Sequence, residues 1–358
     1  MSSWDLVIGL RERLPEALSK ILVSVETAIW LRLPAVIDLA ARAKSKLFRR
    51  RFTPPEIFRR RLKSSNLVVV GGMGMINDAF AELAFQLLAE LEVALDAGIP
   101  VVAFGQGLGP INDPELLKKV CAVFPRLTFI SLREGCSGLP LLEALGVSRD
   151  RILITGDDAV ELAYRHRPSA LGNAIGINCR LAGYAGIDEE LVGMLRVLLK
   201  EVAAASKRPL QPVPISLQEN ESDVSTAERL VDTQYIDSIK QIESPEDVIR
   251  LIGGCRVVVT GSYHAGVFAL AQGIPVVGLV RSTYYEQKFK GLHAQFPGGC
   301  RVLDLRTPLR SEEIRETILD ALESAGKMRE SLLGAAAEQV ALSREAYRTA
   351  QSLCPLQA

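Results

Sequence analysis

Residues 256–280 of the chain, RVVVTGSYHAGVFALAQGIPVVGLV, hold a strand, a turn, a helix and a second strand in succession. The first β-branched run ends at Thr260, and a helical pattern extends from His264 to Gly273 before Pro275 opens the next apolar run. Two consecutive strands joined by a helix pair in parallel, because the helix supplies the crossover that a parallel pair needs. This stretch therefore predicts an open α/β sheet.

The same alternation of apolar strands and helical patterns continues in both directions. Strands are expected at 67–70, 100–104, 127–132, 151–155, 174–179, 211–215, 256–260, 275–280 and 301–304. Helices are expected after the first of these strands and near 187–206, 223–231, 245–253 and 264–272. Repeated alternation predicts parallel strands with helical crossovers, which is a doubly wound α/β architecture.

A chain of 358 residues exceeds what one hydrophobic core usually supports, so two domains are expected. The polar segment RHRPSALGN at 165–173 is the expected linker. Residues 1–165 are expected to form an N-terminal Rossmann-like domain with a helical, basic start, and residues 173–330 a second Rossmann-like domain. Residues 331–358 are expected to form a C-terminal helix that packs back on the first domain. The helical pattern over 311–350 is expected to break near Gly326 or Gly334.

Composition excludes several classes of function. The 42 basic and 42 acidic residues cancel, so no whole-chain field attracts nucleic acid, and no nucleic-acid partner is expected. The six cysteines form no C-x-x-C pair, and none of the three histidines has a partner at metal-ligand spacing. We therefore expect no disulfide framework and no bound metal. No apolar run reaches the roughly 18 residues of a membrane span, and no signal-peptide pattern opens the chain, so a cytoplasmic protein is expected.

One charge asymmetry stands out near the N-terminus. Ten basic residues and one acid, Glu56, lie in segment 42–63; the basic ones are Arg42, Lys44, Lys46, Arg49, Arg50, Arg51, Arg59, Arg60, Arg61 and Lys63. Beside the amphipathic pattern of residues 14–29, this segment is suited to peripheral contact with the anionic inner face of a membrane. A solvated helix face and loop is the more frequent interpretation of such a run.

The histidine of the SYHAG turn is the first candidate for chemistry. His264 begins a helix at the carboxyl edge of a parallel sheet, where open α/β sheets bind ligands and where helix N–H groups favour an anion. A histidine there can bind phosphate or deliver a proton, and Ser262 can cap the helix and donate to the ligand. The alternative is a histidine that only caps its helix.

The segment FISLREGCSGLPLLEALGV, residues 129–147, places Arg133 at a strand end. A guanidinium there can hold a carboxylate or phosphate by two parallel hydrogen bonds, and a salt bridge to Glu134 or Asp157 is the alternative. Asp157 and Asp158 end the next strand. They can cap the following helix, orient Arg133 or bind a sugar hydroxyl, and capping is the expected role.

Two glycine-rich segments also follow strands. VVVGGMGMIND at 68–78 ends in Asp78, which opens a helix, and PVVAFGQGLGP at 100–110 contains Gln106 and Gly107. Their glycines allow backbone N–H groups to approach a ligand, but Pro110 and the spacing do not fit the dinucleotide fingerprint. Turn geometry without ligand contact explains such segments equally well.

Read in order, the motifs GQGLGP, SLREGCS, LGVSRDRILITGDDA, GINCR, VVVTGSYHAGVFALAQGIPVVGL and YYEQKFKGL resemble those of the polysaccharide pyruvyl transferase family, over residues 67–292. The resemblance implies two Rossmann-like domains facing a cleft, as in glycosyltransferase-B folds. It implies transfer of pyruvate from phosphoenolpyruvate to a sugar hydroxyl pair of a cell-surface polysaccharide or its precursor, as a ketal, with no cofactor. The family's histidine, arginine and late lysine fall on His264, Arg133 and Lys288.

Two sets of candidate site residues result. Either Asp157 or Asp158 can serve as the base, and the catalytic set is His264, Arg133 and Asp157. The substrate-binding set adds Ser262, Tyr263, Lys288, Arg281, Asn178, Arg180, Gln106, Gly107 and Asp78. Where the family often has Arg, this chain has Ser262, so Arg281 or Arg180 is expected to supply the missing cation. An N-terminal strand with an Asn-x-Gly-Asp turn, common in the family, is not evident in residues 1–60.

Two other functions fit the same pattern. One is a glycosyltransferase that uses a nucleotide sugar on the same two-lobed fold, because fold does not determine chemistry. The other is a non-catalytic member, suggested by Ser262 and the unusual N-terminus. The expected partners are a small-molecule donor and a glycan acceptor; the acceptor sugar and the oligomeric state do not follow from the sequence.

Overall fold

A computed structural model describes residues 60–62, 64–179, 189–217, 223–231, 239, 242–306 and 311–353. These residues belong to one compact unit that spans residues 54–358. The expected amphipathic helix before residue 34, most of the basic segment 42–63, and Arg180 lie outside the described residues. No helix within the described ranges is both long enough and apolar enough to span a membrane.

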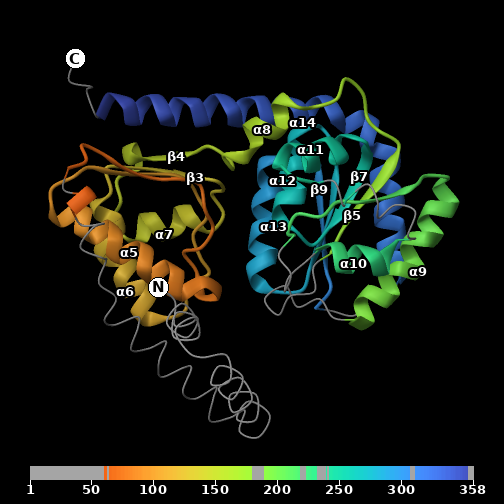
Figure 1. Ribbon diagram of the computed structural model, residues 1–358, viewed down its shortest axis with the longest axis horizontal. Coiled ribbons are helices and arrows are strands. Elements are labelled where there is room, and N and C mark those ends of the chain that lie inside the picture. The colour runs from red at the N-terminus through yellow and green to blue at the C-terminus, as the bar shows by residue number, and fades with distance from the viewer. Residues whose placement is uncertain are drawn as a thin grey trace, which may run out of the picture. The chain divides into compact units, whose positions relative to one another are not determined.

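The first lobe contains a four-stranded parallel sheet in the order β1-β2-β3-β4. Its strands are β1 (Val68–Val70), β2 (Val101–Gln106), β3 (Phe129–Leu132) and β4 (Ile152–Ile154). Its helices are η1 (Asp78–Phe80), α5 (Ala81–Asp96), α6 (Pro114–Val123), η2 (Phe124–Arg126), α7 (Gly138–Ala144) and η3 (Arg149–Arg151). Helices α5, α6 and α7 cover one face, as Figure 1 shows, because their apolar sides bury the same core as that face of the sheet.

The second lobe contains a five-stranded parallel sheet in the order β6-β5-β7-β8-β9. Its strands are β5 (Ala174–Asn178), β6 (Leu210–Pro212), β7 (Cys255–Thr260), β8 (Val276–Val280) and β9 (Cys300–Asp304). Its helices are α9 (Glu189–Ser206), α10 (Asp223–Leu230), α11 (Pro245–Gly253), α12 (Tyr263–Ala271) and α13 (Thr283–Gln295). Apolar clusters on both faces of this sheet confirm the doubly wound architecture.

Helix α8 (Ala159–Arg165) follows the last strand of the first sheet but packs on the second lobe. Its buried residues Val160 and Ala163 share a core with α11 and α12. The chain therefore enters the second lobe directly after the 155–158 turn, before the polar segment 165–173.

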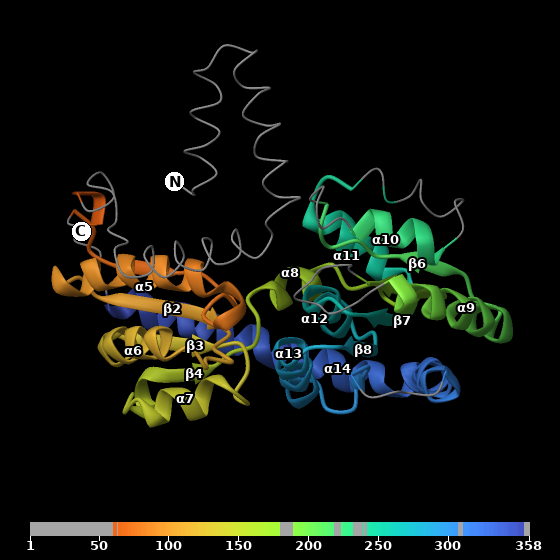
Figure 2. The same cartoon turned by 90° about the horizontal axis from the view of Figure 1, so that it is seen from below.

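Helix α14 (Ser311–Leu353) is continuous over 43 residues, so the expected break near Gly326 or Gly334 is wrong. A helical glycine costs only about 1 kcal/mol relative to alanine, and burial of neighbours such as Ala325 and Leu332 outweighs that cost. The first turns of the helix pack on the second sheet, and Ala346 and Ala350 pack on β2 and β3 of the first. Figures 1 and 2 show α14 passing from one sheet to the other.

The strands lie within about two residues of their expected bounds, apart from β6, which is shorter than 211–215.

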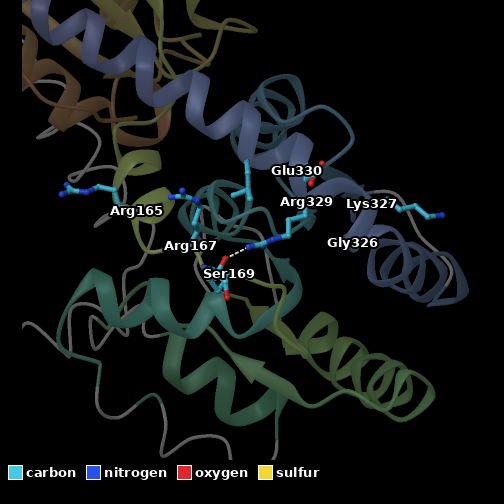
Figure 3. A pocket seen from close by; sticks show the side chains of 9 residues that line it. Arg165, Arg167, Ser169, Gly326, Lys327, Arg329 and Glu330 are labelled. Atoms are coloured by element: carbon cyan, nitrogen blue, oxygen red, sulfur yellow. Dashed lines mark hydrogen bonds between the residues drawn. The ribbon is translucent and has the colours of Figure 1, made fainter.

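Near the amino ends of β7 and β8, residues of the 165–173 connection and of α14 line an open hollow of about 940 Å³ (Figure 3).

Candidate functional site

Arg133 follows β3 directly and contacts residues of the second lobe. Only 5% of its surface is exposed. Its Cζ atom lies 4.4 Å from the ring centroid of Tyr263, at the start of α12, and its Nη1 lies 3.8 Å from Asp157 Oδ2. A cation over an aromatic face and beside a carboxylate is held by two electrostatic attractions.

Two glycines make room for the Arg133 side chain. A Cβ atom at Gly107 would lie 2.4 Å from Arg133 Nε, and one at Gly74 would lie 2.4 Å from Nη2. Neither glycine has a positive φ, so close approach to the guanidinium, and not backbone freedom, requires glycine here. The two glycine-rich segments therefore form a cradle for Arg133, a role that the sequence did not suggest.

The same segments accommodate a second charged side chain, that of Asp158. Cβ atoms at Gly72 and Gly105 would lie 2.6 Å and 2.9 Å from Asp158 Oδ2. Burial raises the pKa of Asp158 and neighbouring Asp157 raises it further, while hydrogen bonds, one of them from Tyr347 of α14 at 3.4 Å, oppose the shift. Asp158 is thus a half-buried carboxyl group with less than its usual preference for the ionised form.

Asp157 performs two of the roles that the sequence left open. Its Oδ1 accepts the Ala159 backbone N–H at 3.0 Å at the start of α8, and its Oδ2 faces Arg133. Burial raises the pKa of Tyr263 well above its usual value, and the nearby charge of Asp157 raises it further, so the phenol stays protonated.

Arg133 is also held through its main chain. Its N–H donates to the Gln106 carbonyl at 3.1 Å, and its carbonyl accepts from Gln295 Nε2 of α13. Gln339 Nε2 of α14 donates in turn to the Gln295 carbonyl at 3.4 Å. Burial alone lowers the pKa of Arg133, but Tyr263, Asp157 and other nearby acidic groups raise it overall, so the group stays charged.

His264 differs from the rest of α12. Every other residue of this nine-residue helix is buried, and His264 alone is exposed. Its ring lies 5.4 Å from the ring of Tyr263 and 6.2 Å from that of Phe268. His264 and Arg133 therefore share one neighbour, the ring of Tyr263.

Lys288 of α13 lies among three tyrosine rings. Its Nζ is 4.0 Å from the ring centroid of Tyr284, 5.4 Å from that of Tyr285 and 5.5 Å from that of Tyr263. Tyr284 in addition donates from its hydroxyl to the Gly74 carbonyl at 3.3 Å. Lys288 thus shares the neighbour Tyr263 with Arg133 and His264.

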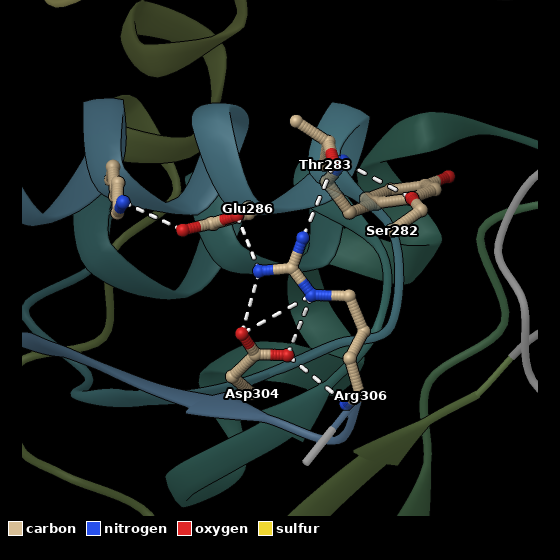
Figure 4. A network of polar contacts seen from close by, with 7 residues as sticks. Ser282, Thr283, Glu286, Asp304 and Arg306 are labelled. Carbon is tan, nitrogen blue, oxygen red and sulfur yellow. Dashed lines mark hydrogen bonds and ion pairs between the residues drawn. The ribbon is translucent and has the colours of Figure 1, made fainter.

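The position of α13 is maintained by Arg306, which follows β9 (Figure 4). The Arg306 guanidinium donates to both carboxylate oxygens of Asp304, to Glu286 and, at 3.2 Å, to Thr283 Oγ1. Hydrogen bonds from Arg306 hold the pKa of Asp304 at about 2, and those from Lys290 and Arg306 lower the pKa of Glu286. This network joins the end of β9 to the first turns of the helix that carries Lys288.

Other expected site residues serve the fold. Asn178 Nδ2 donates to the Val213 carbonyl and to Asp223 Oδ2, both at 2.8 Å, so its amide links neighbouring elements. Asp78 accepts the backbone N–H groups of Asn112 and Asp113, at 2.7 and 3.1 Å, and holds that loop.

Gln106 is 1% exposed, and its amide donates to two carbonyls at 2.7 and 2.8 Å, with no partner found for its Oε1 atom. Ser262 stands at the N-cap of α12, but its side chain makes no capping bond; Thr260 Oγ1 instead accepts the Ser262 N–H at 2.8 Å. Arg281 follows β8 directly and is half-buried.

No cluster of three or more potential metal ligands occurs within the described ranges.

Sequence reasoning missed Gln295, Gln339 and Tyr284. Gln339 had a detectable signal, because it interrupts the apolar face of α14 formed by Leu332, Ala336 and Val340. A glutamine at a core position of an amphipathic helix predicts a specific hydrogen bond. Gln295 had no such signal, because its partner is a main-chain carbonyl in the other lobe.

Solved structures with this two-lobed arrangement define the class of fold. UDP-N-acetylglucosamine 2-epimerases from Listeria monocytogenes and Neisseria meningitidis, the latter bound to UDP-GlcNAc, match with TM-scores of 0.57 and 0.52. Each is 14% identical; the first match covers 82% of this chain and 78% of that chain, and the second 80% of both. At this identity the likeness shows the fold alone, two Rossmann-like lobes of glycosyltransferase-B type.

A family model of the polysaccharide pyruvyl transferases matches residues 7–283. This match covers more than half of the chain, which therefore belongs to the polysaccharide pyruvyl transferase family, a family of enzymes. No curated protein matched the chain in sequence.

Proposed function

We propose that this protein transfers the pyruvyl group of phosphoenolpyruvate to two hydroxyls of a sugar in a cell-surface polysaccharide or its precursor, and forms a cyclic ketal. The observation that carries the proposal is His264, the single exposed residue of a helix that is otherwise buried, at the carboxyl edge of a parallel sheet. Family membership supplies the reaction class.

The reaction needs one proton at carbon and one leaving phosphate. A proton adds to the methylene carbon of phosphoenolpyruvate, and the first sugar hydroxyl attacks the neighbouring carbon and loses its proton. The C–O bond to phosphate then breaks, the phosphate leaves with the bonding electrons, and the second hydroxyl closes the ketal ring. The proton of that second hydroxyl leaves with the phosphate, so the atoms and charges balance.

We assign His264 to the phosphate or to the proton delivered to carbon. Helix α12 begins at this point, so its free N–H groups and dipole favour the same anion. Lys288, half-buried among aromatic rings, provides a second positive charge beside Tyr263. Both groups are more accessible than Arg133.

Arg133 has a different role in this proposal from the one that the motif suggested. Its guanidinium is covered by Tyr263, Asp157 and two glycines, so it fixes the start of α12 and contributes positive potential without direct contact in this arrangement. Asp157 faces Arg133 and accepts the Ala159 N–H at the start of α8, and these contacts favour a positioning role over that of a base.

The setting is part of the proposal. Phosphoenolpyruvate is a cytoplasmic metabolite, and the basic residues of segment 42–63 suit a position at the inner face of the membrane, where a lipid-linked acceptor would be presented. No cofactor is required, because the donor itself carries the energy of the transfer.

A thermal-shift experiment tests the donor. Phosphoenolpyruvate should raise the melting temperature of the wild type and of His166→Gln, an exposed histidine at the C-terminal end of α8, but not that of His264→Gln. UDP-GlcNAc, the ligand of the Neisseria meningitidis epimerase, is the parallel arm. Protection by the sugar nucleotide and none by phosphoenolpyruvate would reject the proposed donor in favour of glycosyl transfer.

A further inference from the structure

The hollow of about 940 Å³ at the second lobe is lined by cationic side chains (Figure 3). Its lining residues are Arg165, Arg167, Pro168, Ser169, Gly326, Lys327, Arg329, Glu330 and Leu333. Four of these are basic and one is acidic. In Figure 3 Arg329 reaches toward the Pro168–Ser169 segment, while Arg165 and Lys327 extend away to either side.

The guanidiniums of Arg329 and Arg167 have hydrogen-bond partners only on the main chain among the described contacts. Arg329 donates to the carbonyls of Gln272, at 3.0 Å, and Pro168. Arg167 donates to the Tyr164 carbonyl at 2.7 Å, and its Cζ lies 3.9 Å from the ring centroid of Tyr164. Carbonyl oxygens and a ring face orient a guanidinium without neutralising it, so the positive charge of the hollow persists.

The two cations also repel each other. Burial lowers the pKa of Arg329, and the charge of Arg167 lowers it further. Like charges brought together without a carboxylate between them are a cost to the folded protein, and a bound anion would remove that cost.

The hollow is separate from the candidate site. Gln272 precedes β8, and Pro168 lies beside Gly253, which precedes β7, so the hollow is at the amino edge of the second sheet. His264 lies at the carboxyl edge of the same sheet. A ligand in the hollow would contact both the polar connection 166–173 and helix α14, the segment that joins the two lobes.

We infer that this hollow is a binding site for a diphosphate group, distinct from the donor site. Arg167 and Arg329 lie close enough to influence each other and can hold one phosphoryl group between them, with the Ser169 hydroxyl as a neutral donor. Arg165 and Lys327 are exposed at the rim, and their long side chains can turn toward a second phosphoryl group. Occupancy would tie the 166–173 segment to helix α14.

Binding is measured by thermal shift and calorimetry on the full chain, with inorganic pyrophosphate and a nucleoside diphosphate in separate arms. Sodium chloride at matched ionic strength controls for general screening. The test variant is Arg167→Gln with Lys327→Gln, which leaves the two Arg329–carbonyl bonds intact. Arg348→Gln, an exposed arginine of α14 outside the hollow, is the matched control.

We expect pyrophosphate or the nucleoside diphosphate to raise the melting temperature of the wild type and of the control variant. The test variant should bind the same ligand at least roughly tenfold more weakly. The diphosphate effective at the lower concentration identifies the source of the group. His264→Gln should keep this shift, which separates the inference from the proposed donor. Equal binding by the test variant, or an equal shift with sodium chloride, would overturn it, as would the lack of any shift in a wild type that melts cooperatively.

Discussion

The substitution Gly107→Ala tests the cradle around Arg133 most directly. The new methyl group would lie 2.4 Å from Arg133 Nε and 2.5 Å from Cζ, so the guanidinium must move. Gly107 does not have a positive φ, and alanine therefore brings no backbone strain of its own. The stability change then reports on Arg133 alone.

The magnitude follows from the interactions of Arg133 that the new methyl group disturbs. Overpacking costs about 1–3 kcal/mol, and separating a buried ion pair costs about 3–5 kcal/mol when one charge is left alone. The Arg133 and Asp157 side chains are 6% and 12% exposed, but their closest atoms are 3.8 Å apart, so partial weakening of this pair is expected. We expect a decrease in unfolding free energy of about 2–4 kcal/mol.

Urea unfolding followed by far-UV circular dichroism measures the change, with Gly71→Ala as the matched control. Nothing lies within 4 Å of a Cβ at Gly71, so that variant should stay within about 0.5 kcal/mol of the wild type. Repeating Gly107→Ala in an Arg133→Ala background completes a double-mutant cycle. The reasoning fails if Gly107→Ala costs the same free energy in both backgrounds.

Three further predictions concern titrating groups. Because burial raises the pKa of Asp158, ionisation of this group above about pH 4 destabilises the folded wild type. The Asp158→Asn variant lacks this ionisation, so its unfolding free energy should rise relative to that of the wild type as pH increases through the raised pKa. Urea titrations from pH 4 to 8 measure the difference. Hydrogen bonds from Arg306 keep the pKa of Asp304 at about 2, so the ionised Asp304 stabilises the fold above about pH 4, and this contribution is lost as pH falls toward 2. Arg306→Gln should therefore lower the melting temperature at pH 5 and low salt, and lower it less at pH 3. Burial raises the thiol pKa values of Cys179, Cys255 and Cys300 to about 12, so mass spectrometry after brief alkylation at pH 7.5 should find these three unlabelled while exposed Cys121 and Cys136 react.

Local sequence patterns predicted most of the fold. Apolar runs separated by helical periodicity located every described strand to within a few residues, because alternation and helical spacing are properties of neighbouring residues. The same local reasoning failed at Gly326 and Gly334, where glycine reduces helix propensity but distant packing decides the outcome.

The sequence by itself determined the doubly wound class and the motif order, and with them the position of His264 at a helix start. Only the tertiary structure decided which groups meet there. Gly74 and Gly107 form a cradle around Arg133, and the Tyr263 ring is a neighbour of both Arg133 and His264. These contacts join segments from different strands and both lobes. Contacts between residues so distant in sequence leave no period or spacing in the chain, because they are set by how the sheets pack and not by local backbone preference.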